Sequence, residues 1–124
     1  MRTVVIKTAP PEDFFRRGRE LAERADAGEP IPEQRVISFE DPDELLQLLT
    51  PARRALLQTI KDMPGSIAAI AARLHRDRRA VKRDLDALAR YDLITIEAKA
   101  LPGHGRMKEV SLGAEHYRLE AQLA

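Results

Sequence analysis

The 124-residue sequence predicts an α+β fold with a β-α-β segment, four further helices, a two-stranded hairpin and a final strand. Three observations carry this prediction. Two short runs rich in β-branched residues lie within the first forty residues. Apolar residues then recur at helical spacing in successive segments that start at capping residues. Two alternating stretches joined by a glycine-containing loop come next.

The first forty residues predict a β-α-β segment. Thr3 to Thr8 and Arg35 to Phe39 are short β-branched runs, which is typical of strands. Between them Glu12 to Ala27 has the spacing of a helix, with Phe14, Leu21, Ala22 and Ala25 near one helical face. No glycine-rich phosphate loop follows the first strand, so the segment does not indicate a nucleotide site.

Two helices with clear start signals are expected next. Asp41 caps a helix from Pro42 to about Leu49, and Thr50 caps another from Pro51 to about Met63. Proline at the first helical position suits both starts, because the missing N–H would have no partner there. Pro64 and Gly65 end the second helix.

A helix, a tight turn and a second helix follow. Ser66 is a good N-cap for a helix from Ile67 to Leu74, His75 and Arg76 make the turn, and Asp77 caps a helix from Arg78 to about Tyr91. The apolar stripe of this last helix consists of Val81, Leu85 and Leu88. The pattern is that of a helix-turn-helix.

The second helix of this pair is strongly basic in its N-terminal half, where it carries Arg78, Arg79, Lys82 and Arg83. A recognition helix reads base edges with that half. Arginine can fork to guanine, and both lysine and arginine neutralise phosphates. Charge is also unevenly spread along the chain. The stretch 53–108 has 13 Lys and Arg against 6 Asp and Glu, whereas 9–50 has 5 against 11.

A basic hairpin completes the pattern. Leu93 to Ala98 and Met107 to Leu112 alternate as strands, and Lys99 to Arg106 is expected to be the loop between them. A wing of this kind reaches phosphates or the minor groove. The sequence therefore predicts a winged helix-turn-helix whose DNA-binding residues are Ser66, Arg76, Arg78, Arg79, Lys82, Arg83, Lys99, His104, Arg106 and Lys108.

The run from Leu49 to Leu112 resembles the MarR-like winged helix-turn-helix transcriptional regulators. The matching marks are Ser66, Ala71, Asp77, Val81, Leu85 and the run Tyr91-Asp92-Leu93-Ile94. The whole chain is similar to small prokaryotic predicted regulators with an N-terminal extension, often proposed to be antitoxin-like DNA-binding proteins. Many helix-turn-helix turns place glycine where His75 stands, and histidine tolerates the left-handed conformation better than most residues.

The C-terminal segment, Ala114 to Ala124, allows two interpretations. Strict alternation of Tyr117, Leu119, Ala121 and Leu123 favours a strand, whereas the helix propensities of Ala, Glu, Leu and Gln leave a helix open. As a strand it could join Thr3 to Thr8 and Arg35 to Phe39 in a sheet separate from the wing. We expect three parts: an extension over 1–41, a DNA-binding domain over 42–112, and a C-terminal strand over 113–124 that, with the extension, forms a homodimer.

The composition argues against several other classes of function. The absence of cysteine removes disulfides and thiolate sites, and fits a cytoplasmic protein. No apolar run approaches the ~20 residues of a membrane span. The histidines His75, His104 and His116 lack the spacing of a local metal motif. We therefore expect no enzyme activity, no catalytic residue, no cofactor and no metal.

The expected function is that of a sequence-specific, dimeric transcriptional regulator, a repressor that binds double-stranded DNA. Its helix 78–91 would enter the major groove, and its wing 99–108 would contact the backbone or minor groove. The alternative is an antitoxin-type module that neutralises a toxin partner through the acidic first third and also regulates its own operon. A winged helix used only for protein or RNA contacts is the third hypothesis.

Overall fold

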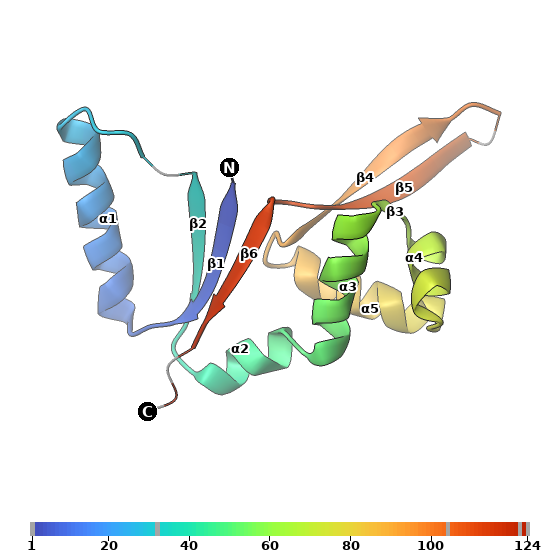
Figure 1. The fold of residues 1–124 in the computed structure, drawn as a ribbon, viewed down its shortest axis with the longest axis horizontal. Helices are drawn as coiled ribbons and strands as arrows, with labels where there is room; N and C mark the ends of the chain where they lie inside the picture. The colour runs from blue at the N-terminus through green and yellow to red at the C-terminus, as the bar shows by residue number, and fades with distance from the viewer. Residues whose placement is uncertain (1, 32, 104, 122, 124) are drawn as a thin grey trace. The chain divides into compact units, whose positions relative to one another are not determined.

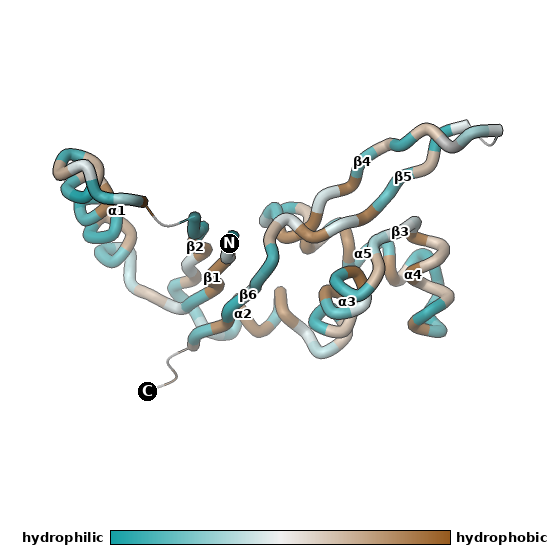
Figure 2. The backbone as a smooth tube through the Cα atoms, turned by 45° about the horizontal axis from the view of Figure 1, so that its top comes forward, coloured by the Kyte–Doolittle hydropathy of each residue, from teal (hydrophilic) through white to brown (hydrophobic). Residues whose placement is uncertain are grey.

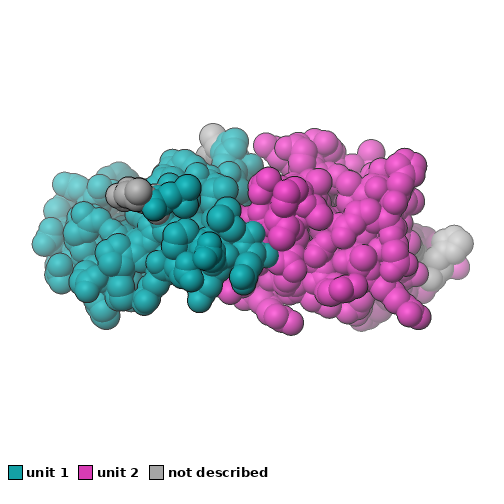
Figure 3. Space-filling model, turned by 90° about the horizontal axis from the view of Figure 1, so that it is seen from below, with its two compact units in different colours: residues 1–47, 114–124 teal, residues 48–113 magenta. Residues whose placement is uncertain are grey.

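The computed structural model describes residues 2–31, 33–103, 105–121 and 123. The chain divides into two compact units, which Figure 3 shows in different colours. Unit 1 consists of residues 1–47 and 114–124, and unit 2 consists of residues 48–113. Unit 2 is therefore inserted, along the chain, between two segments of unit 1. The described residues form five helices and two three-stranded sheets (Figure 1).

The sheet of unit 1 is entirely parallel. Its strands are β1 (Thr3–Thr8), β2 (Gln34–Phe39) and β6 (His116–Glu120), in the order β2-β1-β6. Val4, Val5 and Ile6 of the central strand are buried in succession, as expected for a parallel strand covered on both faces. The strand interpretation of the C-terminal segment is confirmed, and so is its pairing in a sheet separate from the hairpin.

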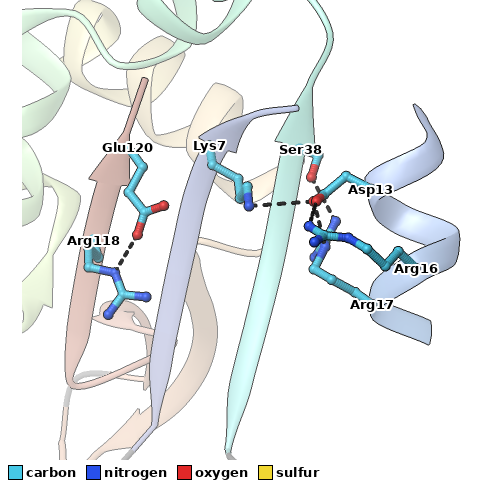
Figure 4. A network of polar contacts seen from close by, with 7 residues as sticks. All are labelled: Lys7, Asp13, Arg16, Arg17, Ser38, Arg118 and Glu120. Atoms are coloured by element: carbon cyan, nitrogen blue, oxygen red, sulfur yellow. Dashed lines mark hydrogen bonds and ion pairs between the residues drawn. The ribbon is translucent and has the colours of Figure 1, made fainter. Parts of the chain in front are cut away.

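A buried carboxylate anchors the first helix, α1 (Pro11–Asp26), to this sheet (Figure 4). Asp13 accepts a hydrogen bond from Arg16, accepts another from Nε of Arg17 at 3.0 Å, and lies 3.4 Å from the ammonium of Lys7 on β1. Arg17 also donates to Oγ of Ser38 on β2 at 2.8 Å. The hydrogen bond from Arg16 is the main reason why the pKa of Asp13 lies below its ordinary value.

The two aromatic residues of α1 are not buried against the sheet. Phe14 and Phe15 are 65% and 64% exposed, and their rings meet edge to face with centroids 5.6 Å apart. Leu21 is also exposed, and the helix mixes hydrophilic and hydrophobic colours along its length (Figure 2). A shallow groove separates the helix from β2, and it is lined mostly by polar side chains: Arg17, Glu20, Leu21, Arg24, Gln34 and Val36.

Helices α2 (Pro42–Leu48) and α3 (Pro51–Asp62) start at the expected caps. Oδ1 of Asp41 accepts a hydrogen bond from the backbone N–H of Asp43 at 2.9 Å, and Oγ1 of Thr50 accepts one from the N–H of Arg53 at 3.2 Å. Each cap satisfies a donor that has no partner within the helix. Both helices end one residue earlier than the sequence predicts.

The turn between α4 (Ile67–Leu74) and α5 (Arg78–Ala89) depends on a left-handed residue. His75 has φ 52°, and its N–H donates to the carbonyl of Ala72 at 3.2 Å. The N–H of Arg76 donates to the carbonyl of Ala71 at 3.0 Å. This pair of bonds is a Schellman motif, which closes the helix and reverses the chain.

The sheet of unit 2 has the order β3-β5-β4. Its strands are β3 (Gly65–Ser66), β5 (Gly105–Leu112) and β4 (Ile94–Leu101), and all pairs are antiparallel. The sequence did not predict β3. Beside this sheet, α5 ends at Ala89 instead of Tyr91, because the chain turns at Asp92, which has φ 55°.

The loop predicted over Lys99 to Arg106 is wrong in its extent. Lys99 pairs with Met107, Ala100 with Arg106 and Leu101 with Gly105, so the strands run on almost to the tip of the hairpin. Only residues 102–104 lie between them, and Gly103 and Gly105 take positive φ. Each added pair satisfies backbone groups that a loop would leave to water.

Glycine at position 75 tests the role of the left-handed turn. His75→Gly removes a Cβ from a residue at φ 52°, so we expect it to stabilise the protein by about 0.5–1 kcal/mol. Ala72→Gly, three residues earlier within α4, should destabilise it by about 1 kcal/mol. Urea unfolding followed by circular dichroism measures both. A lower midpoint for His75→Gly would show that the imidazole makes a stabilising contact.

Candidate nucleic-acid interface

Helix α5 has a buried side and a basic side. Val81, Leu85 and Leu88 are fully buried where the helix packs against α3, α4 and β4. Asp77 caps its first turn, with Oδ2 3.4 Å from the N–H of Ala80. The 3.6-residue period then places Arg79 and Arg83 on the opposite side. Burial of the stripe therefore determines which cations the helix presents to solvent.

Arg78, Arg79 and Arg83 are exposed, and their side chains make no ion pair or hydrogen bond with other described residues. Lys82 is exposed as well, and its ammonium lies 2.9 Å from Asp86, one helical turn further on. An exposed pair of this kind is weak and yields readily to another anion. The four predicted cations of α5 thus lie together at the N-terminal half of one helix.

Sequence reasoning missed Arg90, which follows the last residue of α5 in helical conformation. Arg90 is exposed and has no side-chain partner among the described residues. Eleven residues separate it from Arg79, which is close to three full turns, so both lie on the same side of the helix. The spacing between Arg79 and Arg90 was the signal in the sequence that could have identified Arg90.

Arg76, by contrast, is engaged inside unit 2. Its Nη2 donates to Oδ2 of Asp84 at 2.8 Å, and Nε of Arg53 on α3 donates to Oδ1 of the same carboxylate at 3.1 Å. The side chains of Arg53, Arg76 and Asp84 are 19%, 28% and 15% exposed. Asp84 occupies the buried side of α5, three residues after Val81 and four before Leu88, a spacing that could have revealed it.

Burial and the two arginines act on Asp84 in opposite directions. Removal from water favours the neutral acid, but the hydrogen bonds from Arg76 and Arg53 together outweigh it, so the pKa of Asp84 is below its ordinary value. The carboxylate is therefore charged at neutral pH and balances two guanidinium groups.

Ser66 lies at the start of α4 and serves the fold. Its Oγ accepts a hydrogen bond from the N–H of Ala69 at 3.1 Å, and its residue pairs with Glu109 in the sheet. The cap fixes the first turn of α4, as the sequence predicts.

The hairpin register separates the predicted cations of the wing. Arg106, Lys108 and Val110 lie two residues apart along β5, so Arg106 and Lys108 share the face that carries the buried Val110. Lys99 lies on the other face, where its ammonium is 2.8 Å from the carboxylate of Glu109. This contact holds the pKa of Lys99 above its ordinary value. Neither Arg106 nor Lys108 has a side-chain partner among the described residues. His104 lies outside the described residues.

The part of the chain that the structure describes bears on two further classes of site. No group of three or more His, Asp or Glu side chains there has an arrangement able to hold a metal ion. None of the helices there combines the length and apolar character of a membrane span.

The depressed pKa of Asp84 gives a pH-dependent contribution to stability. A carboxylate with a lowered folded pKa stabilises the fold above its unfolded pKa of about 3.9 and loses this effect as pH falls through the folded pKa. We expect Asp84→Asn to cost about 1.5–3 kcal/mol at pH 7, and this cost to shrink below about pH 4. Urea unfolding of both proteins at several pH values measures the difference. A cost independent of pH would show that the charge of Asp84 is irrelevant.

Comparison with known proteins adds a family. No curated protein is significantly similar in sequence to this chain. Among solved structures, the chain is similar to a "Possible transcriptional regulator from Methanosarcina mazei Go1", with a TM-score of 0.49 and 18% identity, over 62% of this chain and 68% of that chain. The model of the family HVO_A0114 matches residues 48–112, which is just over half of the sequence and nearly all of unit 2. The chain therefore belongs to the HVO_A0114 family.

Proposed function

We propose that unit 2 is a winged helix-turn-helix of MarR-like type that binds double-stranded DNA, and that the protein is a sequence-specific transcriptional regulator acting as a repressor. Helix α5 would lie in the major groove with its N-terminal half against the bases. One observation carries the proposal: Arg78, Arg79 and Arg83 are exposed without side-chain partners among the described residues, on a helix whose other side is buried. Arginine in this position can bond guanine bidentately.

The hairpin would supply a second contact. Arg106 and Lys108 share one face near the tip of the hairpin, and both are exposed. Cations on a hairpin of this kind reach phosphates or the minor groove. Ser66 and Arg76 have roles within the fold, and Lys99 is paired with Glu109, so these three are weaker candidates than the sequence suggests.

A dimer would double the DNA contact and match a palindromic site. We infer that unit 1 forms it, because α1 leaves Phe14, Phe15 and Leu21 exposed. Contiguous exposed apolar residues mark interaction surfaces.

The same surface favours a second candidate function, in which unit 1 binds a different protein, such as a toxin that the chain neutralises. The negative charge of the stretch 9–50 is the additional observation, since a DNA-binding protein has no need of it. The two functions are compatible in a protein that represses its own operon.

Loss of the arginines of α5 tests the assignment of the recognition helix. Arg79→Ala and Arg83→Ala should each weaken binding to a duplex selected from a random library by the unaltered protein, by about 1–3 kcal/mol per lost bidentate contact. Gel shifts at fixed salt measure the change. Arg19→Ala, an exposed arginine of α1, makes the same charge change and should have little effect. Equal affinity of all three variants and the unaltered protein would overturn the assignment.

The two faces of the hairpin provide a matched pair of wing variants. Arg106→Ala should reduce duplex affinity and lower the slope of log K against log salt by about 0.9, the value for one phosphate contact. Lys99→Ala should leave the slope unchanged, because Lys99 lies on the other face beside Glu109. A larger effect at Lys99 would place the DNA on the opposite side of the hairpin.

Light scattering tests the dimer. The unaltered protein should have about twice the chain mass of 14.0 kDa at micromolar concentration, because burial of two phenylalanines per chain favours association. Phe14→Ser with Phe15→Ser should give the monomer, and Met63→Ser, at an exposed apolar residue of unit 2, should not. Another outcome would replace the dimer by the partner hypothesis. In that outcome the unaltered protein is monomeric and captures the product of an adjacent gene, and the double variant no longer captures it.

A further inference from the structure

One carboxylate joins three separate parts of unit 2. Asp84 of α5 accepts hydrogen bonds from Arg53 in the first turn of α3 and from Arg76 in the turn between α4 and α5. All three side chains are largely buried. Arg76 directly precedes Asp77, the cap of α5, so the same contact fixes the end of the helix where Arg78 and Arg79 stand.

The two arginines depend on Asp84 to different degrees. Arg53 has other contacts, including a hydrogen bond from Nη1 to the carbonyl of Leu48 at 3.1 Å. The Nη1 of Arg76 is buried and has no hydrogen-bond partner among the described residues. Asp84 therefore supplies the contact that keeps Arg76 folded against the protein, and loss of the carboxylate would release Arg76 before Arg53.

We propose that Asp84 is a positioning residue that determines specificity, a role that rests on the proposed DNA-binding function. It refines the rotation that burial of the apolar stripe gives to α5, so that Arg79 and Arg83 meet the bases in one orientation. It also keeps Arg76 away from phosphates, which are the same in every sequence. Both effects raise the ratio of specific to non-specific affinity.

Apolar packing alone does not give this precision. The stripe of Val81, Leu85 and Leu88 holds α5 by contacts without directional preference. Charge-assisted hydrogen bonds from two sides have defined geometry. An asparagine at position 84 would present an N–H₂ group to one arginine, where two donors face each other and no bond forms.

Asp86 offers a matched control on the same helix. Its side chain is 47% exposed, and its carboxylate pairs only with Lys82 among the described residues. Asp84→Asn and Asp86→Asn change the net charge equally, so a difference between them reports the buried contact and not the charge. Because Lys82 is already exposed, its release should alter DNA binding little.

The experiment measures affinity for two duplexes over a range of salt concentrations, at a temperature where circular dichroism shows each variant folded. One duplex is selected from a random library by the unaltered protein, and the other has a random sequence. Relative to Asp86→Asn, Asp84→Asn should bind the selected duplex about tenfold more weakly. It should bind the random duplex more tightly, with a salt slope steeper by about 0.9. General destabilisation would not produce tighter binding to random DNA.

A second substitution distinguishes the release of Arg76 from misfolding of the protein. Arg76→Gln should leave the salt slope of the otherwise unaltered protein unchanged, and should remove the added slope of about 0.9 in the Asp84→Asn background. If Arg76→Gln alone lowers the slope, Arg76 contacts DNA directly and the proposal is overturned. Because Arg76→Gln alone retains Asp84, its measurement can overturn the proposal even if Asp84→Asn does not fold.

The outcomes also distinguish the proposal from the function on which it rests. Equal specificity ratios for Asp84→Asn and Asp86→Asn, with binding still lost in Arg79→Ala, would reject the role of Asp84 and leave the recognition helix in place. Absence of salt-dependent duplex binding by the unaltered protein would reject the DNA-binding function itself.

Discussion

The arrangement of unit 2 depends on the burial of Val81, Leu85 and Leu88, the stripe through which α5 packs against α3, α4 and β4. A helix can bury only one side when the other is highly charged, so this contact sets the rotation of α5 and leaves Arg79 and Arg83 in water. The Arg53–Asp84–Arg76 contact then adds direction to a packing interaction that has little of its own. Packing of the core therefore determines which side chains form the candidate interface.

Local signals could be read from the sequence, and they gave most elements of the fold. Caps at Thr50, Ser66 and Asp77 are present, and His75 takes the left-handed conformation that its position requires. Contacts between distant residues could not be read in the same way. The strand β3 is two residues long, and its pairing with β5 depends on tertiary approach and not on periodicity. The sequence did not show that Arg76 pairs with Asp84 or Lys99 with Glu109, because ion pairs between separate elements have no fixed spacing along the chain.

In unit 1, the apolar pattern of the sequence did not predict which side chains of α1 contact the sheet. The sequence places several apolar residues near one face of α1, and such a face ordinarily packs on the sheet. Instead, Asp13 and Arg17 bond to side chains of β1 and β2, and the aromatic residues remain exposed. Polar contacts of this kind position α1 without burying its aromatic residues. Phe14 and Phe15 therefore remain available for the protein contact that we propose for unit 1.

The parallel pairing of β6 with β1 has a consequence for how the chain folds. The two strands are separated by more than a hundred residues of sequence, and all of unit 2 lies between them. During synthesis unit 2 is contiguous and can form as soon as it leaves the ribosome, whereas the sheet of unit 1 stays two-stranded until β6 has been synthesised. Pairs so distant in sequence form slowly, because a large loop must close first. The nascent chain would therefore hold a folded unit 2 before it completes the sheet of unit 1.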